Sequence, residues 1–173
     1  MLVFTGSIMS EMIHPDIGSI LEGNRTKYGI KASQLLDNLY IWGFRHLYSA
    51  AWHALKAKKY DRMISKSLSI EVLLYAAGQR QIKKAFTLLG VKKTTKDVAG
   101  ILLGETSQDL INASQQLQKE LYIKPNIKLL DDFTTKNELF IKILNKDGYQ
   151  ATDFTFNEIE KAVLQKIALL ALE

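Results

Sequence analysis

Histidines and paired carboxylates are the first residues in this 173-residue chain that could do chemistry. His46 and His53 lie seven residues apart, so they share one face of an expected helix. As metal ligands they would need two or three partners, and no nearby carboxylate shares that face, so we favour a solvated or interface role. Asp131 and Asp132 form the only pair of adjacent carboxylates. They come just before an expected helix, where they suit a turn and the helix dipole better than acid–base catalysis.

The motifs of the common enzyme classes are absent from the sequence. Neither glycine-rich phosphate loop is present, and neither H-E-x-x-H nor G-x-S-x-G occurs. The chain has no cysteine, which excludes a disulfide framework, a thiolate zinc site, an iron–sulfur centre and a cysteine nucleophile. We therefore predict a protein with no catalytic residues, no cofactor and no bound metal. A small enzyme whose site assembles from scattered residues is the less favoured alternative.

Positive charge is concentrated in one segment of the chain. The whole chain has 23 Lys and Arg against 18 Asp and Glu, a net charge of +5. Residues 56–96, the basic segment, hold 11 basic and 2 acidic residues, a net charge of +9, which leaves −4 for the remainder. Trp52, Tyr60 and Tyr75 lie within or beside this segment. Basic side chains bind phosphates and aromatic rings stack unpaired bases, so RNA contact is one interpretation and a plain solvated surface is the other.

Helical patterns dominate the elements that would position these residues. One apolar stripe at helix spacing, predicted to face the core, consists of Phe44, Leu47, Tyr48, Ala51 and Leu55. Residues 67–89 form a second helical stretch, which Gly78 is expected to interrupt. Its first half is apolar almost all round, which is typical of a buried or docked helix. The inner face of its second half is predicted to be Ile82, Ala85, Phe86 and Leu89.

The sequence predicts fewer strands than helices, and the strands are shorter. Residues 2–6 read as a strand, residues 28–36 give a poor strand pattern, and the apolar run 98–104 is typical of a central strand covered on both faces. Helices are expected within residues 9–22, over 107–121 and from about Thr135, which has capping-box spacing with Glu138. The last helix has the clearest start, because Thr155 and Glu158 make a capping box.

This order of elements predicts a mixed α/β fold. We expect a single helix-rich domain over residues 1–173, with one small central β-sheet covered by helices. The N-terminus lacks the basic start and long apolar run of a secretory signal, and no segment approaches the ~18 apolar residues of a membrane span. We therefore expect a soluble cytoplasmic protein with no membrane partner.

The centre of the chain resembles the signature of a known family. Residues 65–85 (SKSLSIEVLLYAAGQRQIKKA) have its serine-containing cap, its Ile-Glu pair, a glycine, and then Arg-Gln-Ile. The helix before this run, with His46-Leu47 and Ala50, Ala51 and Ala54, and the ending VLQKIALLAL agree with it. The chain is identified as similar to the kinase-binding regulatory subunit of the KEOPS (EKC) complex, the family of the human PRPK-binding protein TPRKB, in its archaeal-type form. One departure is Ile64, where the signature usually has asparagine.

The resemblance implies a non-catalytic role. Members of this family bind and stimulate the atypical kinase/ATPase subunit of KEOPS, and through it meet the other subunits. The complex makes threonylcarbamoyladenosine next to the anticodon of tRNA. Archaeal-type members also bind tRNA, including its single-stranded CCA 3′ end. A free-standing tRNA-binding module is the alternative function.

Two sets of residues follow as site hypotheses. The tRNA surface is predicted to include Lys66, Arg80, Gln81, Lys83 and Lys84. Arg80 suits contact with a phosphate or a base because its guanidinium is planar and always charged. In the alternative, Arg80 and Gln81 have a structural role and close the helix break at Gly78. The kinase surface is predicted on the last helix, with Val163, Ile167 and Leu170, for which simple core packing is the alternative.

Overall fold

A small antiparallel sheet forms the centre of the molecule. The computed structural model describes residues 1–9 and 16–172. Its strands are β1 (Leu2–Ser7), β2 (Ala32–Asp37), β3 (Asp97–Leu103) and β4 (Lys124–Pro125), in the order β2-β3-β1-β4. Every pairing is antiparallel, and β3 lies between β2 and β1. The strand predicted to be central is therefore central, and it is buried along almost its whole length.

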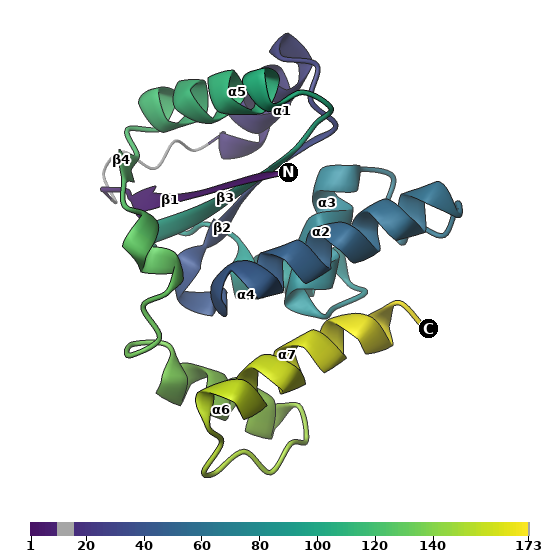
Figure 1. Cartoon of the computed structure of the whole chain (residues 1–173), viewed down its shortest axis with the longest axis vertical. Coiled ribbons are helices and arrows are strands. Elements are labelled where there is room, and N and C mark those ends of the chain that lie inside the picture. The colour runs from purple at the N-terminus through teal and green to yellow at the C-terminus, as the bar shows by residue number, and fades with distance from the viewer. Residues whose placement is uncertain (10–15, 173) are drawn as a thin grey trace.

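Helices cover both faces of this sheet (Figure 1). One face is covered by α1 (Ile17–Lys27) and α5 (Ser107–Glu120). The other carries α2 (Gly43–Lys59), α3 (Leu68–Ala77), α4 (Ile82–Leu89), α6 (Asn137–Lys146) and α7 (Phe156–Leu170). Short 3-10 helices occupy Asn38–Tyr40 and Ile127–Leu130. The mixed α/β, helix-rich fold with one small covered sheet is thus confirmed.

The two faces of the sheet belong to two separate hydrophobic cores. The smaller core joins Phe4 of β1 and Leu35 of β2 to Leu117 of α5. The larger one joins alternate residues of the same strands, such as Leu36, to α2, α3, α6 and α7. Successive side chains of a strand point to opposite faces, so continuously apolar strands can supply both cores. Phe4 lies directly over Gly100 on the paired strand, where any Cβ would collide with its ring.

Several boundaries were predicted correctly from local signals. Gly78 does interrupt the stretch 67–89: it ends α3 in the left-handed conformation, with φ of 57°. Left-handed backbone favours glycine because it has no Cβ. The Thr155–Glu158 capping box is present at the start of α7. Helix α1, the first described helix, begins at Ile17 and runs past the predicted end at Glu22 to Lys27, and residues 10–15 of the predicted range lie outside the described residues.

Other expectations were wrong or only partly right. Of the five residues on α2 predicted to face inwards, Leu47 and Ala51 are buried, but Phe44, Tyr48 and Leu55 are exposed. The buried face of α2 consists mainly of alanines. In α4 only Ala85 and Leu89 are buried, whereas Ile82 and Phe86 are exposed. The capping box expected at Thr135 does not form. Helix α6 begins at Asn137 instead, and the buried Lys136 side chain donates to the carbonyls of Leu129 and Leu130.

None of the helices in the described part of the chain is both long enough and apolar enough to cross a membrane.

Candidate functional site

An open pocket lies where α2, α3 and α7 end together. Helices α2 and α7 run side by side, and both finish at the right-hand end of Figure 1. The pocket there has a volume of about 570 Å³. We call it the basic pocket, because its lining includes three cationic side chains and, among the described residues, no acidic one. Its residues are His53, Lys56, Ala57, Tyr60, Arg62, Ile64, Tyr75, Arg80, Ala168, Leu170, Ala171 and Leu172.

Glu71 fixes one wall of the basic pocket. This residue is fully buried on α3, and its carboxylate accepts hydrogen bonds from the backbone N–H groups of Ile64 and Ser65, at 3.0 and 2.8 Å, and from the Ser65 hydroxyl at 2.9 Å. It therefore ties the loop that carries Arg62 and Ile64 to the start of α3. Because Ile64 takes part through its backbone, the departure from the family's asparagine leaves this bond intact.

An aromatic pair forms the floor of the basic pocket. The rings of His53 and Tyr75 stack with their centroids 5.6 Å apart and their planes 27° apart. Burial, and secondarily the nearby Lys56 charge, lowers the pKa of His53, so its ring is neutral near pH 7. Burial also raises the pKa of Tyr75, which stays a phenol. Nδ1 of His53 is buried and has no hydrogen-bond partner among the described residues. A buried polar atom without a partner is costly, so this nitrogen is an unmet hydrogen-bonding position beside the pocket.

Arg80 connects the basic pocket to a second groove. This groove has a volume of about 410 Å³ and shares Arg80 and Leu170 with the basic pocket. Gln81 and Lys84 also line it, and its one carboxylate, Asp147, is already paired with Lys166. The exposed Arg80 guanidinium has no hydrogen bond or ion pair to any described residue. It is therefore free to bind an anion from either side.

The predicted RNA-binding residues divide into two groups. Arg80, Gln81 and Lys84 are brought together on the groove, whereas Lys66 and Lys83 are exposed but line neither cavity. The alternative role of Arg80 and Gln81, closing the helix break, is filled by the backbone. The N–H groups of Gly78 and Gln79 donate to the carbonyls at the end of α3, both at 3.0 Å.

Residues that sequence reasoning left out complete the site. They are His53, Lys56, Tyr60, Arg62 and Tyr75. A signal for most of them was present, because they lie within the basic segment or among its aromatic residues. Nothing in the sequence indicated that the end of α7 would close the pocket over them.

The residues predicted to bind the kinase are buried in this chain. Val163, Ile167 and Leu170 belong to the larger hydrophobic core, with exposed fractions of 7%, 1% and 6%. Their packing role is therefore clear, and a role in kinase binding stays a prediction. The nearby exposed apolar residues are Leu169, on the last turn of the same helix, and Leu172, just after its end.

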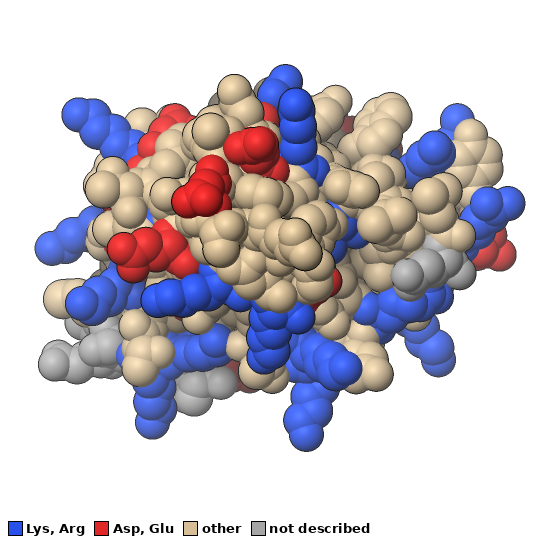
Figure 2. All heavy atoms as spheres, turned by 90° about the horizontal axis from the view of Figure 1, so that it is seen from below, with Lys and Arg blue, Asp and Glu red and all other residues tan. Residues whose placement is uncertain are grey.

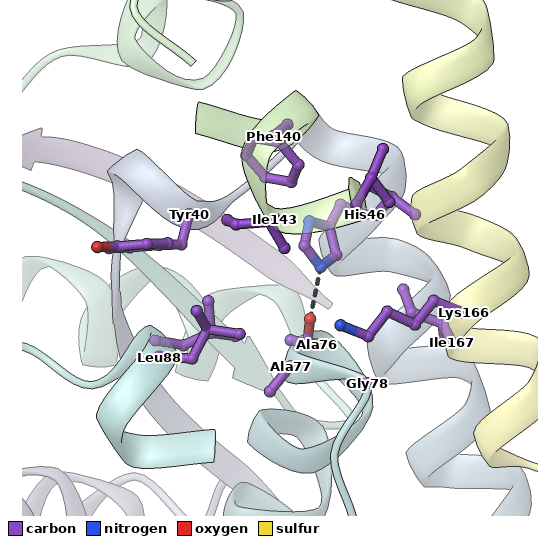
Figure 3. Close-up of a pocket in the computed structure, with 13 residues that line it drawn as sticks. Tyr40, His46, Ala76, Ala77, Gly78, Leu88, Phe140, Ile143, Lys166 and Ile167 are labelled. Atoms are coloured by element: carbon purple, nitrogen blue, oxygen red, sulfur yellow. Dashed lines mark hydrogen bonds between the residues drawn. The ribbon is translucent and has the colours of Figure 1, made fainter. Parts of the chain in front are cut away.

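A small cavity lies further along the seam between α2 and α7, where α3, α4 and α6 also line it (Figure 3). Its volume is about 30 Å³, enough for about one water molecule. His46 lines it and uses both ring nitrogens: Nδ1 accepts from the Trp42 N–H at 3.0 Å, so Nε2 donates to the Ala76 carbonyl at 2.7 Å. Burial lowers the pKa of His46 to about 4. His46 was expected on a solvated or interface face; it is instead a buried residue with a structural role.

Charge and ligand chemistry limit what the site can do. In Figure 2, Lys and Arg lie along the edges of this face, including the end where α2 and α7 finish, whereas the main group of Asp and Glu lies left of centre. Within the described residues, no three His, Asp or Glu side chains are placed to hold a metal ion. The arrangement offers cations, aromatic faces and one unpaired ring nitrogen, which suits the binding of an anionic, planar ligand.

Fold and site together define a small mixed α/β protein built around a cationic binding surface. The sequence matches the family described as kinase binding protein CGI-121 over residues 15–171, which is nearly the whole chain. The chain belongs to this family. A search of curated proteins found no match.

Proposed function

We propose that this chain is a non-catalytic regulatory subunit of the KEOPS complex. In this role it binds and activates the atypical kinase/ATPase subunit in the cytoplasm. It also helps to recruit tRNA for threonylcarbamoyladenosine modification next to the anticodon. Membership of a kinase-binding family supports the first part, and the resemblance of residues 65–85 to the KEOPS subunit supports the context.

The basic pocket is the observation that carries tRNA recruitment. It combines Lys56, Arg62 and Arg80 with the stacked His53–Tyr75 pair and the unpaired Nδ1. Cations that follow a phosphate backbone and aromatic rings that stack bases are the usual means of holding an unpaired strand. An unpaired strand fits better than a duplex, because a duplex hides its base faces from aromatic side chains. The single-stranded CCA 3′ end of tRNA has the required chemistry.

Kinase activation follows from binding alone. A subunit without catalytic groups can change the activity of a partner only by binding one of its conformations more tightly than another. With Val163, Ile167 and Leu170 buried in the free chain, docking by α7 falls to exposed neighbours such as Leu169 and Leu172. Both lie next to the basic pocket and the groove, so the kinase and tRNA would meet at adjacent surfaces.

Filter binding of tRNA tests the RNA part of the proposal. Arg80→Ala should weaken binding about tenfold, and the combined reversal Lys83→Glu and Lys84→Glu should weaken it and flatten its salt dependence, because each lost phosphate contact lowers the salt slope by about one. Lys119→Ala is the matched control, since this exposed lysine lies on α5 across the sheet. Unchanged affinity in both variants would reject tRNA recruitment by this surface.

Co-purification with the KEOPS kinase of the same organism tests the proposed binding and activation of the kinase. Leu169→Asp should leave the chain folded, lower the yield of the complex and reduce stimulation of ATP hydrolysis. Ile111→Asp, on the exposed side of α5, is the control. If the wild-type chain neither co-purifies with that kinase nor alters its activity, the KEOPS assignment is wrong.

A further inference from the structure

The outer face of α2 is more apolar than a solvated helix face needs to be. Phe44, Tyr48, Trp52 and Leu55, the α2 stripe, have exposed fractions of 49%, 51%, 57% and 37%. The inner face of the same helix is built largely from Ala50, Ala51, Ala54 and Ala57. The four large side chains of the α2 stripe therefore leave much of their apolar surface outside the core, although core burial is where it would stabilise the fold most.

These side chains form a continuous surface because they are spaced by about one helical turn. Phe44, Tyr48 and Trp52 follow one another at four-residue intervals, so they lie on one face about 6 Å apart along the helix axis. The Phe44 and Tyr48 rings already stack, with centroids 6.1 Å apart. A row of three aromatic faces of this kind offers about one stacking position per ring.

All the charged side chains on α2, the helix that carries the stripe, are positive. The charged residues of α2 are Arg45, Lys56, Lys58 and Lys59, and none is acidic. Arg45 is paired with Glu160 of α7 at 2.9 Å. The three lysines have no ion pair to any described residue. The half of the stripe nearest the end of α2 is therefore strongly cationic.

The stripe also leads to the basic pocket. Lys56 follows Trp52 by four residues, so the two side chains are neighbours on the helix surface. Lys56 and Tyr60 line the basic pocket. A strand leaving that pocket would meet Trp52 first, then Tyr48 and Phe44.

We propose that the α2 stripe is a stacking surface for single-stranded RNA, which continues the path of the strand held in the basic pocket. The cores of protein interfaces are depleted in lysine, whereas aromatic rings beside lysines are typical of surfaces that bind unpaired nucleotides. The inference rests on the proposed tRNA function and adds to it. It assigns RNA contacts to Phe44, Tyr48 and Trp52, beyond the pocket itself.

Fluorescence anisotropy with two labelled RNA probes tests the proposal. A three-nucleotide RNA fits the pocket alone, and an eight-nucleotide RNA reaches the stripe. Trp52→Ala should weaken binding of the longer RNA about 5-fold to 100-fold, the usual loss for one base stack, and leave the shorter one within about twofold. Trp52→Phe should retain most of the affinity. Tyr122→Ala is the matched control, an exposed aromatic residue outside the basic segment.

Tryptophan fluorescence tests base stacking on Trp52 independently of the anisotropy measurements. The chain has two tryptophans, the buried Trp42 and the exposed Trp52. Stacking of a base on Trp52 should quench emission with the eight-nucleotide RNA but not with the shorter RNA, and Trp52→Phe should remove the quenching. Thermal unfolding of each variant should match the wild type, because these side chains are exposed.

Three results would overturn the inference. If the stripe variants Trp52→Ala and Tyr48→Ala bind the longer RNA normally while Arg80→Ala does not, the stripe does not bind RNA but the pocket does, and the proposed function stands. If all these variants, Arg80→Ala included, bind RNA normally, both proposals fail. If the stripe variants bind RNA normally but lose the kinase, the stripe is a protein-docking surface.

Discussion

Two histidines on one face of α2 have opposite surroundings. His46 is buried in the seam between α2 and α7, where both ring nitrogens are hydrogen-bonded. Two helical turns further on, His53 lies at the open end of the seam, on the basic pocket of about 570 Å³, and its Nδ1 has no partner among the described residues. The same residue type on the same helix is therefore fully hydrogen-bonded in one place and incompletely hydrogen-bonded in the other.

The difference in hydrogen bonding between His46 and His53 indicates a different role for each. Folding removes the His46 ring and the Nδ1 atom of His53 from water, which costs free energy unless hydrogen bonds replace the water. The protein makes that replacement at His46 with Trp42 and Ala76, and leaves it incomplete at His53. The unpartnered nitrogen, the pocket and its three cations make the open end the candidate for ligand binding.

The largest effect should come from Leu170, which is buried at the open end of the seam. Leu170→Asp places a carboxylate without a partner in the core and should lower the free energy of unfolding by about 4 kcal/mol or more, enough to unfold many domains. Leu169→Asp, one residue earlier and 47% exposed, should cost less than about 1 kcal/mol. Urea denaturation followed by circular dichroism measures both. A folded Leu170→Asp that loses only the kinase would show that this residue belongs to the interface.

Removing each histidine compares the two ends directly. His46→Ala leaves the Trp42 N–H and the Ala76 carbonyl without partners and should cost about 3 kcal/mol of stability. His53→Ala removes no hydrogen bond and should cost less than about 1 kcal/mol, while weakening RNA binding. Equal losses of stability in the two variants would contradict the distinction between a structural and a ligand-binding histidine.

Acid should destabilise the protein through His46. Its pKa is about 4 when folded and about 6.5 when unfolded, so the unfolded chain binds more protons between these values. Stability from this group is fully present above pH 6.5 and is lost as the pH falls, by about 2 kcal/mol at pH 5. Denaturation at pH 7 and pH 5 measures the loss, and His46→Gln should reduce it. An unchanged pH dependence in that variant would show that other groups cause it.

A smaller effect is expected at Gly78, which lies between the small cavity beside His46 and the groove. Its φ of 57° and the Lys166 side chain, 2.6 Å from any added Cβ, both oppose substitution. Gly78→Ala should cost about 1–2 kcal/mol. Adding Lys166→Ala should recover only part of this loss in thermal unfolding, because the backbone strain remains. Full recovery would mean that the collision alone matters.

Local signals in the sequence were enough for much of the fold. The capping box at Thr155 and the glycine at position 78 act within a few residues, so their effects could be predicted. The apolar run of β3 marked a strand buried on both faces. The inner face of α2 was predicted only in part: Leu47 and Ala51 are buried, but three larger residues are exposed. Residue size was taken as a sign of burial, whereas alanines allow close packing against neighbouring helices.

The sequence by itself determined the composition of the binding surface: the basic segment, its aromatic residues and the family signature all lie on one continuous stretch. Only the tertiary structure decided how that stretch is used. The parallel course of α2 and α7 brings residues more than 100 positions apart to one pocket, and the same contact buries Val163, Ile167 and Leu170. Such long-range contacts depend on how whole helix faces pack together, and no local pattern records them.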